Sequence, residues 1–181
     1  MGVAACQIPP MRERETARVV LLDPDGRVLL MKGRLPSDPG GPAFWYTVGG
    51  GVDPGESLAE AAAREVVEET GLADVVLGPV VWRDETILED LQGEVRLFLQ
   101  FYVVAHTAGG ALSRAGWHDY ERRLTDEMRW WTLEELQLTG DTVYPEGLAE
   151  LLPDVLAGRY APEPLVIRTL DGPVRPLPRP G

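Results

Sequence analysis

The segment Ser57–Thr70 constrains the fold of this chain more than any other part of the sequence. It is rich in alanine, and Ser57 and Glu60 stand at the spacing of a capping box, in which each residue bonds the backbone N–H of the other. Gly71 follows at the position where a helix commonly ends in a left-handed residue. The segment therefore predicts one well-defined helix of about four turns.

Three acidic residues lie on the inward face of this predicted helix. At 100° per residue, Glu65, Glu68 and Glu69 fall within a sector of about 100°. The same face carries Leu58, Ala61 and Ala62 nearer the N-terminus, so the acids continue an apolar stripe. The opposite face, with Glu60, Arg64 and Val67, is expected to meet solvent.

The position of these acids is unfavourable for a purely structural helix. Like charges at helical-neighbour spacing destabilise a helix by about 0.2–0.5 kcal/mol per pair. Acids in the last turns also lie near the negative end of the helix dipole, which destabilises the helix by about 0.3–1 kcal/mol. A bound cation reverses both penalties. The chain has one cysteine and two histidines, so three carboxylates indicate an all-oxygen site for Mg²⁺ or Mn²⁺ and not for zinc. The alternative, a solvated acidic face, conflicts with the inward phase.

A glycine triplet, Gly49-Gly50-Gly51, precedes the helix. Glycines let backbone groups approach a phosphate or a metal ion closely, although a triplet alone is more often only a turn. The loop is not a Walker loop, because the only lysine, Lys32, is followed by Gly33 and not by serine or threonine.

Loop and helix together, residues 50–72, resemble the Nudix box, G-x5-E-x7-R-E-U-x-E-E-x-G-U, in which U is a bulky aliphatic residue. With this chain's composition, a chance match is on the order of one in a million. Val48 departs from relatives that often carry proline there, which concerns loop rigidity more than chemistry. Every fixed position is matched, by Gly50, Glu56, Arg64, Glu65, Val66, Glu68, Glu69, Gly71 and Leu72.

The resemblance implies a magnesium- or manganese-dependent hydrolase that cleaves the pyrophosphate bond of a nucleoside diphosphate linked to another group. The implied metal ligands are Glu65, Glu68, Glu69 and the carbonyl of Gly49. Glu56 and Arg64 would orient these ligands, and Arg64 would join the three glutamates in the catalytic set. The general base is left open: Glu68 is favoured, and Glu121, Asp126 and Glu127 are the candidates outside the box.

Substrate contacts lie outside the box and follow less directly. Aromatic residues that could stack on a base are Trp45, Tyr46, Phe98 and Tyr102, although aromatic strand residues more often pack in the core. Basic residues that could neutralise phosphates are Lys32, Arg34 and Arg83. We predict contacts from Trp45, Arg34, Arg83, Phe98 and Glu127. Nucleoside triphosphates, including oxidised ones, ADP-ribose-like nucleotide sugars and dinucleoside polyphosphates all stay open.

Two other functions compete with hydrolysis. A Nudix-fold domain that binds or senses a nucleotide without turnover would be expected to lack some of the acids, and this chain has them all. An isopentenyl diphosphate isomerase of the same superfamily would need a catalytic cysteine, and the only cysteine, Cys6, lies in the N-terminal segment that we expect to be disordered.

Composition limits partners and location. The formal net charge of −12 disfavours general nucleic-acid binding. No apolar run approaches the roughly 20 residues of a membrane span. A single cysteine allows no intrachain disulfide, and we therefore expect a cytoplasmic protein. A homodimer is compatible with the sequence.

The chain predicts one α/β (α+β) domain, a mixed β-sheet sandwiched between helices, over residues 15–168. Proline-rich ends, residues 1–14 and 169–181, are expected to be disordered. A hairpin around Asp23-Pro24-Asp25-Gly26 should open the domain. The expected strands are 17–22, 28–31, 44–48, 75–82, 95–103 and 128–131, and the further helices are a short one capped by Thr132 and Glu135 and one at 146–156 interrupted by Pro153.

Overall fold

The computed structural model describes residues 12–89 and 94–168 as a seven-stranded mixed sheet with helices on both sides. The strand order is β6-β2-β3-β1-β5-β4-β7. The strands are β1 (Glu13–Leu22), β2 (Val28–Gly33), β3 (Phe44–Gly51), β4 (Val75–Glu89), β5 (Val95–Thr107), β6 (Thr125–Trp131) and β7 (Leu165–Arg168). The helices are α1 (Leu58–Thr70), α2 (Asp119–Leu124), α3 (Leu133–Leu138) and α4 (Leu148–Leu156).

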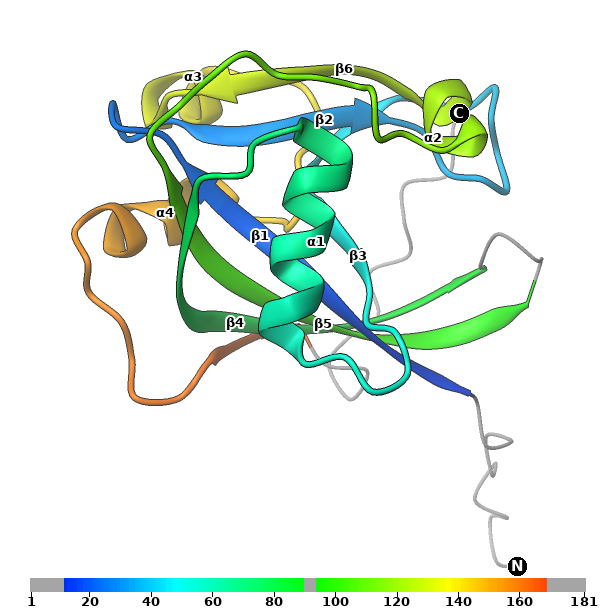
Figure 1. Cartoon of the computed structure of the whole chain (residues 1–181), viewed down its shortest axis with the longest axis horizontal. Coiled ribbons are helices and arrows are strands. Elements are labelled where there is room, and N and C mark those ends of the chain that lie inside the picture. Colours follow the sequence, from blue (N-terminus) through cyan, green and yellow to red (C-terminus); the bar gives the residue numbers. More distant parts are fainter. Residues whose placement is uncertain (1–11, 90–93, 169–181) are drawn as a thin grey trace, which may run out of the picture.

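The central strand β1 joins the two halves of the sheet. It pairs antiparallel with β3 on one side and parallel with β5 on the other, and β5 continues antiparallel to β4. Helix α1 lies across one face, whereas α3 and α4 lie toward the other (Figure 1). The predicted mixed sheet between helices is therefore confirmed.

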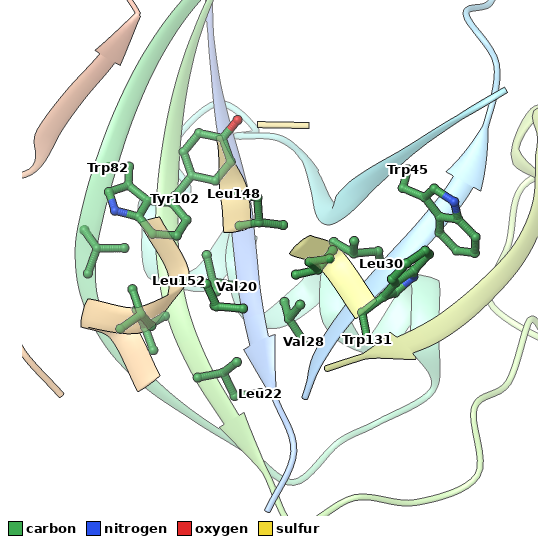
Figure 2. Close-up of a cluster of buried hydrophobic side chains, with 14 residues drawn as sticks. Val20, Leu22, Val28, Leu30, Trp45, Trp82, Tyr102, Trp131, Leu148 and Leu152 are labelled. Atoms are coloured by element: carbon green, nitrogen blue, oxygen red, sulfur yellow. The ribbon is translucent and has the colours of Figure 1, made fainter. Parts of the chain in front are cut away.

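Alternation along β1 explains why the sheet has a core on each face, since successive side chains point to opposite sides. Val20 and Leu22 pack against Leu148 and Leu152 of α4, and Trp45 lies beside Trp131 in the same cluster (Figure 2). The odd-numbered neighbours pack with α1 in a second cluster, which includes Ala17, Val19, Leu21, Ala61, Ala62 and Val66.

Helix α1 has both predicted ends. The Ser57 hydroxyl accepts from the Glu60 N–H and the Glu60 carboxylate accepts from the Ser57 N–H, so the capping box is complete. Gly71 ends the helix with φ of 74°, the left-handed conformation that favours glycine. These ends fix which turns of α1 face the sheet.

Several boundaries differ from the sequence predictions. Strand β1 begins at Glu13, so two residues of the segment expected to be disordered pair in the sheet; residues 1–11 and 169–181 lie outside the described residues. Strands β4 and β5 are longer than predicted because they form one long antiparallel ribbon. Helix α2 and strand β7 were missed. Pro153 lies inside α4 without interrupting it.

No helix within the described ranges is long and apolar enough to cross a membrane.

Candidate active site

A cleft of about 520 Å³ lies where the glycine triplet, α1 and α2 meet the polar ends of the central strands. Its wall includes Gly49, Gly50, Gly51, Glu65, Glu68 and Glu69 from the predicted site. The helix phase that turns the acids inward thus brings them to the floor of a cleft.

Arg64 donates hydrogen bonds to three of the acidic residues, although its helical phase predicted that it would face solvent. Its Nε and Nη2 donate to the two carboxylate oxygens of Glu56 at 2.9 and 3.0 Å, and Nη2 also donates to the Gly51 carbonyl at 2.9 Å. Its Nη1 donates to Glu65 at 2.7 Å and to Glu68 at 3.2 Å. The Arg64 guanidinium lowers the pKa of Glu56 to about 2, with a further contribution from the Asp53 N–H.

Glu69 is buried and joins α1 to β3. Its carboxylate accepts a hydrogen bond of 2.7 Å from the Gly49 N–H, and only 6% of the residue is exposed. Burial raises the pKa of Glu69 well above its ordinary value, and repulsion from Glu65 adds to this. A neighbouring cation would reverse that effect.

Glu65 lies against Gly50. A Cβ atom at Gly50 would collide with the Glu65 carboxylate, so glycine is needed for this close approach. Burial raises the pKa of Glu65, and its bond to Arg64 opposes this only in part. The cleft therefore contains two carboxylates whose charged forms are costly without a cation.

The donors around the cleft fit a hard divalent cation, in that three carboxylates and the Gly49 carbonyl supply only oxygen. In their present rotamers, no three Asp, Glu, His or Cys side chains of the described ranges stand close enough together to hold an ion. The Glu68 side chain is 40% exposed and bonds only to Arg64 among the described residues, so it can rotate toward its two buried neighbours.

Among the three candidate bases outside the box, Glu121 is the one that lines the cleft. It lies in α2, where its carboxylate accepts from the His118 N–H at 2.6 Å and from the Tyr120 hydroxyl at 3.1 Å. Its charge contributes to the raised pKa of both Glu65 and Glu69. Asp126 instead accepts from Arg34 Nη1 with both carboxylate oxygens at 2.8 Å, and Glu127 does not line the cleft.

The predicted substrate contacts divide into two groups. Arg34 and Phe98 line the cleft, whereas Trp45, Arg83 and Glu127 do not. Trp45 is only 2% exposed, packs edge-on against Trp131 and donates its indole N–H to Asp141 at 2.9 Å, so its ring is a core residue. The structure corrects the predicted stacking role of Trp45.

Several residues that line the cleft were not predicted from the sequence. One face of the central strands presents a polar wall, in which Thr16 pairs with Gln100 and Gln100 with Asp84 across the sheet. The alternation of Arg14, Thr16 and Arg18 was the available signal, but their place in the cleft depends on strand pairing. Phe44 and Tyr144 add an aromatic edge, with ring centroids 5.3 Å apart.

The family model of the NUDIX domain matches residues 12–154, which is most of the chain and includes the whole cleft floor. The chain belongs to the Nudix family. The predicted membership is confirmed, and the 23-residue box corresponds to the loop and α1 described above.

Curated relatives match over shorter stretches. An RNA pyrophosphohydrolase of Caulobacter vibrioides is 44% identical over 66 residues, 36% of this chain and 37% of that protein. A putative 8-oxo-dGTP diphosphatase of Bacillus subtilis is 45% identical over 56 residues, 30% of this chain and 33% of that protein. The matches with these two relatives thus span about a third of their lengths.

Solved structures match over nearly the whole fold. The MutT protein of Methanosarcina mazei superposes with a TM-score of 0.57 at 20% identity, over 80% of this chain and 93% of that one. An ADP-ribose pyrophosphatase of Streptococcus suis superposes with a TM-score of 0.54 at 19% identity, over 86% of this chain and 97% of that one. These similarities establish that the Nudix fold extends well beyond the box.

Proposed function

We propose that this chain is a divalent-metal-dependent pyrophosphohydrolase that acts on a nucleoside diphosphate derivative. The observation that carries the proposal is the Arg64 network, which connects Glu56, Glu65, Glu68 and Gly51 at one end of the cleft. A nucleotide-binding domain without turnover has no need to hold so many acids at one end of a cleft. The names of the two curated relatives described above, an RNA pyrophosphohydrolase and a putative 8-oxo-dGTP diphosphatase, support the same class of reaction.

Glu65, Glu68, Glu69 and the Gly49 carbonyl would hold Mg²⁺ or Mn²⁺, which would neutralise the pyrophosphate and help water to ionise. Arg64 and Glu56 keep Glu65 at the cleft floor. The Gly49 N–H fixes the Glu69 carboxylate and so fixes the distance between α1 and the glycine triplet. These residues position a phosphate chain; a carboxylate then removes the proton from the attacking water.

Glu121 gains support as that base over Asp126 and Glu127, and Glu68 stays the alternative within the box. Glu121 lines the cleft, whereas Asp126 is occupied by Arg34. Glu121→Gln should lower kcat about 100-fold or more with little change in KM, because a general base contributes about 10²–10⁴-fold. The matched control is Glu127→Gln. Equal activity of wild type and Glu121→Gln would assign the role to Glu68.

The proposal is tested by incubating the protein with Mg²⁺ or Mn²⁺ and a panel of nucleotides. Nucleoside triphosphates, an oxidised triphosphate, a nucleotide sugar, a dinucleoside polyphosphate and an RNA with a 5′-triphosphate should be included. Release of monophosphate and of phosphate or pyrophosphate, separated by chromatography, identifies the reaction. Loss of all turnover in excess EDTA is expected.

A nucleotide sensor is the second candidate, and turnover by the wild type, compared with Glu69→Gln, separates it from a hydrolase. The amide oxygen can still accept from the Gly49 N–H, so the fold should persist while hydrolysis is abolished. If the wild type binds nucleotides tightly in Mg²⁺ but turns none over, the chain is a sensor and the hydrolase proposal fails. Cytoplasmic location and homodimer formation stay predictions.

A further inference from the structure

Two arginines in the cleft form no ion pair with an acidic residue of the described ranges. Arg14 and Arg18 both lie on β1 and both line the cleft. Within residues 12–89 and 94–168, neither guanidinium forms an ion pair, and Arg14 also makes no hydrogen bond. By contrast, the other cleft arginines are neutralised, Arg34 by Asp126 at 2.8 Å and Arg64 by Glu56 at 2.9 Å. In a chain of net charge −12, two unpaired guanidiniums beside a catalytic floor call for an explanation.

The two guanidiniums lie at opposite ends of the glycine triplet. Arg18 donates from Nη1 to the Gly49 carbonyl at 3.0 Å. The Arg14 guanidinium lies against Gly51, where an added Cβ would collide with it. Gly49 and Gly51 are two residues apart on one strand, about 7 Å by strand rise. That separation is longer than a single phosphate group, and it suits two neighbouring phosphates of one polyphosphate.

Arg18 is positioned by two neutral hydrogen-bond partners, and its positive charge also opposes the rise in the pKa of the nearby Glu69. Its Nε donates to the Gln100 side-chain oxygen at 2.9 Å. The Gln100 amide nitrogen in turn donates to Thr86 at 3.3 Å and to Asp84 at 3.4 Å. A guanidinium has five N–H donors, and Arg18 uses two of them here. The remaining three can reach an anion without breaking this network.

The charge of the site indicates how many phosphates it takes. The predicted metal ligands and their cation would hold the pyrophosphate that is cleaved, and this leaves Arg14 and Arg18 as a further cationic pair. A nucleotide sugar has no phosphate beyond its pyrophosphate, whereas a nucleoside triphosphate has one more. Arginine suits this task because its planar fork binds phosphate oxygens in pairs.

We propose that Arg14 and Arg18 form a phosphate subsite beside the glycine triplet, and that the substrate is therefore a nucleoside carrying three or more phosphates. This inference rests on the proposed pyrophosphohydrolase function, in which the acids at the cleft floor and their cation bind the pyrophosphate that is cleaved. The formal net charge of −12 favours the free nucleotide over RNA with a 5′-triphosphate.

The first test uses the metal-free full chain and inorganic tripolyphosphate at low ionic strength, with binding measured by calorimetry. Arg14→Gln and Arg18→Gln should each weaken binding about tenfold or more, the factor expected for a charge-assisted hydrogen bond. Arg14→Lys should recover part of the affinity because it keeps the charge. Arg123→Gln is the control, since Arg123 is exposed on α2, outside the cleft. Unchanged affinity in both cleft variants overturns the proposal.

The second test compares steady-state kinetics in Mg²⁺. Arg14→Gln should raise KM for a nucleoside triphosphate about tenfold or more and change KM for ADP-ribose less than about twofold. An equal effect on both substrates, or a higher kcat/KM for 5′-triphosphate RNA than for the free nucleotide, overturns the substrate assignment. A wild type that binds tripolyphosphate but hydrolyses nothing removes the proposed function and leaves the anion subsite intact.

Discussion

The Glu69 carboxylate accepts a 2.7 Å hydrogen bond from the Gly49 N–H, which joins the last turn of α1 to the end of β3. Both partners are predicted metal-binding residues, Glu69 through its carboxylate and Gly49 through its carbonyl. The same bond places a buried carboxyl group next to the glycine triplet. The stability of this chain should therefore depend on pH and on divalent metal together.

The metal-free protein should lose stability as pH rises above about 4.5. Burial raises the pKa of Glu69 above its ordinary value of 4.5, so between the two values the folded protein keeps a proton that the unfolded chain releases. Glu65 acts in the same direction. The pKa of Glu56 is instead lowered to about 2, so Glu56 affects stability in a different pH range. Its contribution to the stability of the folded protein is lost only as pH falls from 4.5 toward 2.

Urea denaturation in EDTA at a series of pH values measures this dependence. Glu69→Gln should flatten the decline above pH 4.5 and stabilise the metal-free protein at neutral pH, and saturating Mg²⁺ should stabilise the wild type more than the variant. Identical pH profiles for wild type and variant would show that Glu69 is not the group responsible.

Gly50→Ala should impair activity without unfolding the chain. The added Cβ meets the Glu65 carboxylate, which must move away from the cleft floor, while the backbone keeps an ordinary conformation. We expect a loss of about 10–100-fold in metal affinity or activity, as for other residues that orient metal ligands. Gly40→Ala is the control, because nothing lies within 4 Å of its added Cβ. A fully active Gly50→Ala protein would argue against Glu65 as a ligand.

Removal of Arg64 should destabilise the fold as well as the site. Arg64→Gln leaves Glu56 and Glu65, with side chains 16% and 11% exposed, without their cationic partner. We expect the free energy of unfolding to fall by about 1–3 kcal/mol. Arg64→Lys should lower it by less, because lysine keeps the positive charge. The comparison is Arg159→Gln, which removes an exposed pair with Asp154 and should cost about 0–1 kcal/mol. Equal urea midpoints for Arg64→Gln and wild type would contradict this role.

Substitution of Trp45 should mainly lower stability, whereas substitution of Phe98 should mainly raise KM. Trp45→Phe loses core volume and the bond to Asp141, so it should lower the free energy of unfolding by about 1–3 kcal/mol and leave KM unchanged. Phe98→Ala removes a half-buried ring of the cleft wall and should raise KM with a smaller loss of stability. A raised KM in a folded Trp45→Phe protein would restore the stacking role that the structure removes.

The sequence predicted α1 and its acids because every signal there is local. The capping box, Gly71 and the phase of Glu65 and Glu69 depend only on helix geometry. Arg64 was misplaced because its Cβ direction points outward, whereas its long side chain folds back over the acids. Cβ direction alone does not locate a guanidinium.

The polar wall of the cleft required tertiary information. Thr16, Asp84 and Gln100 meet only because β1, β4 and β5 pair in a particular register, and a shift of one residue would turn each to the other face. Helix α2 was missed because it is short, has no buried residue and therefore shows no apolar period. Glu121 accordingly had no more support from sequence than Asp126 or Glu127.

The central claim is that Glu65, Glu68 and Glu69 share a divalent cation at the floor of the cleft. Crystals soaked in Mn²⁺ test it directly through anomalous scattering. The account predicts an anomalous peak within bonding distance of these carboxylates that disappears in Glu69→Gln. The claim would be contradicted if the soaked crystals showed a well-defined cleft with no such peak at saturating Mn²⁺, and the three side chains still bonded only to Arg64 and Gly49.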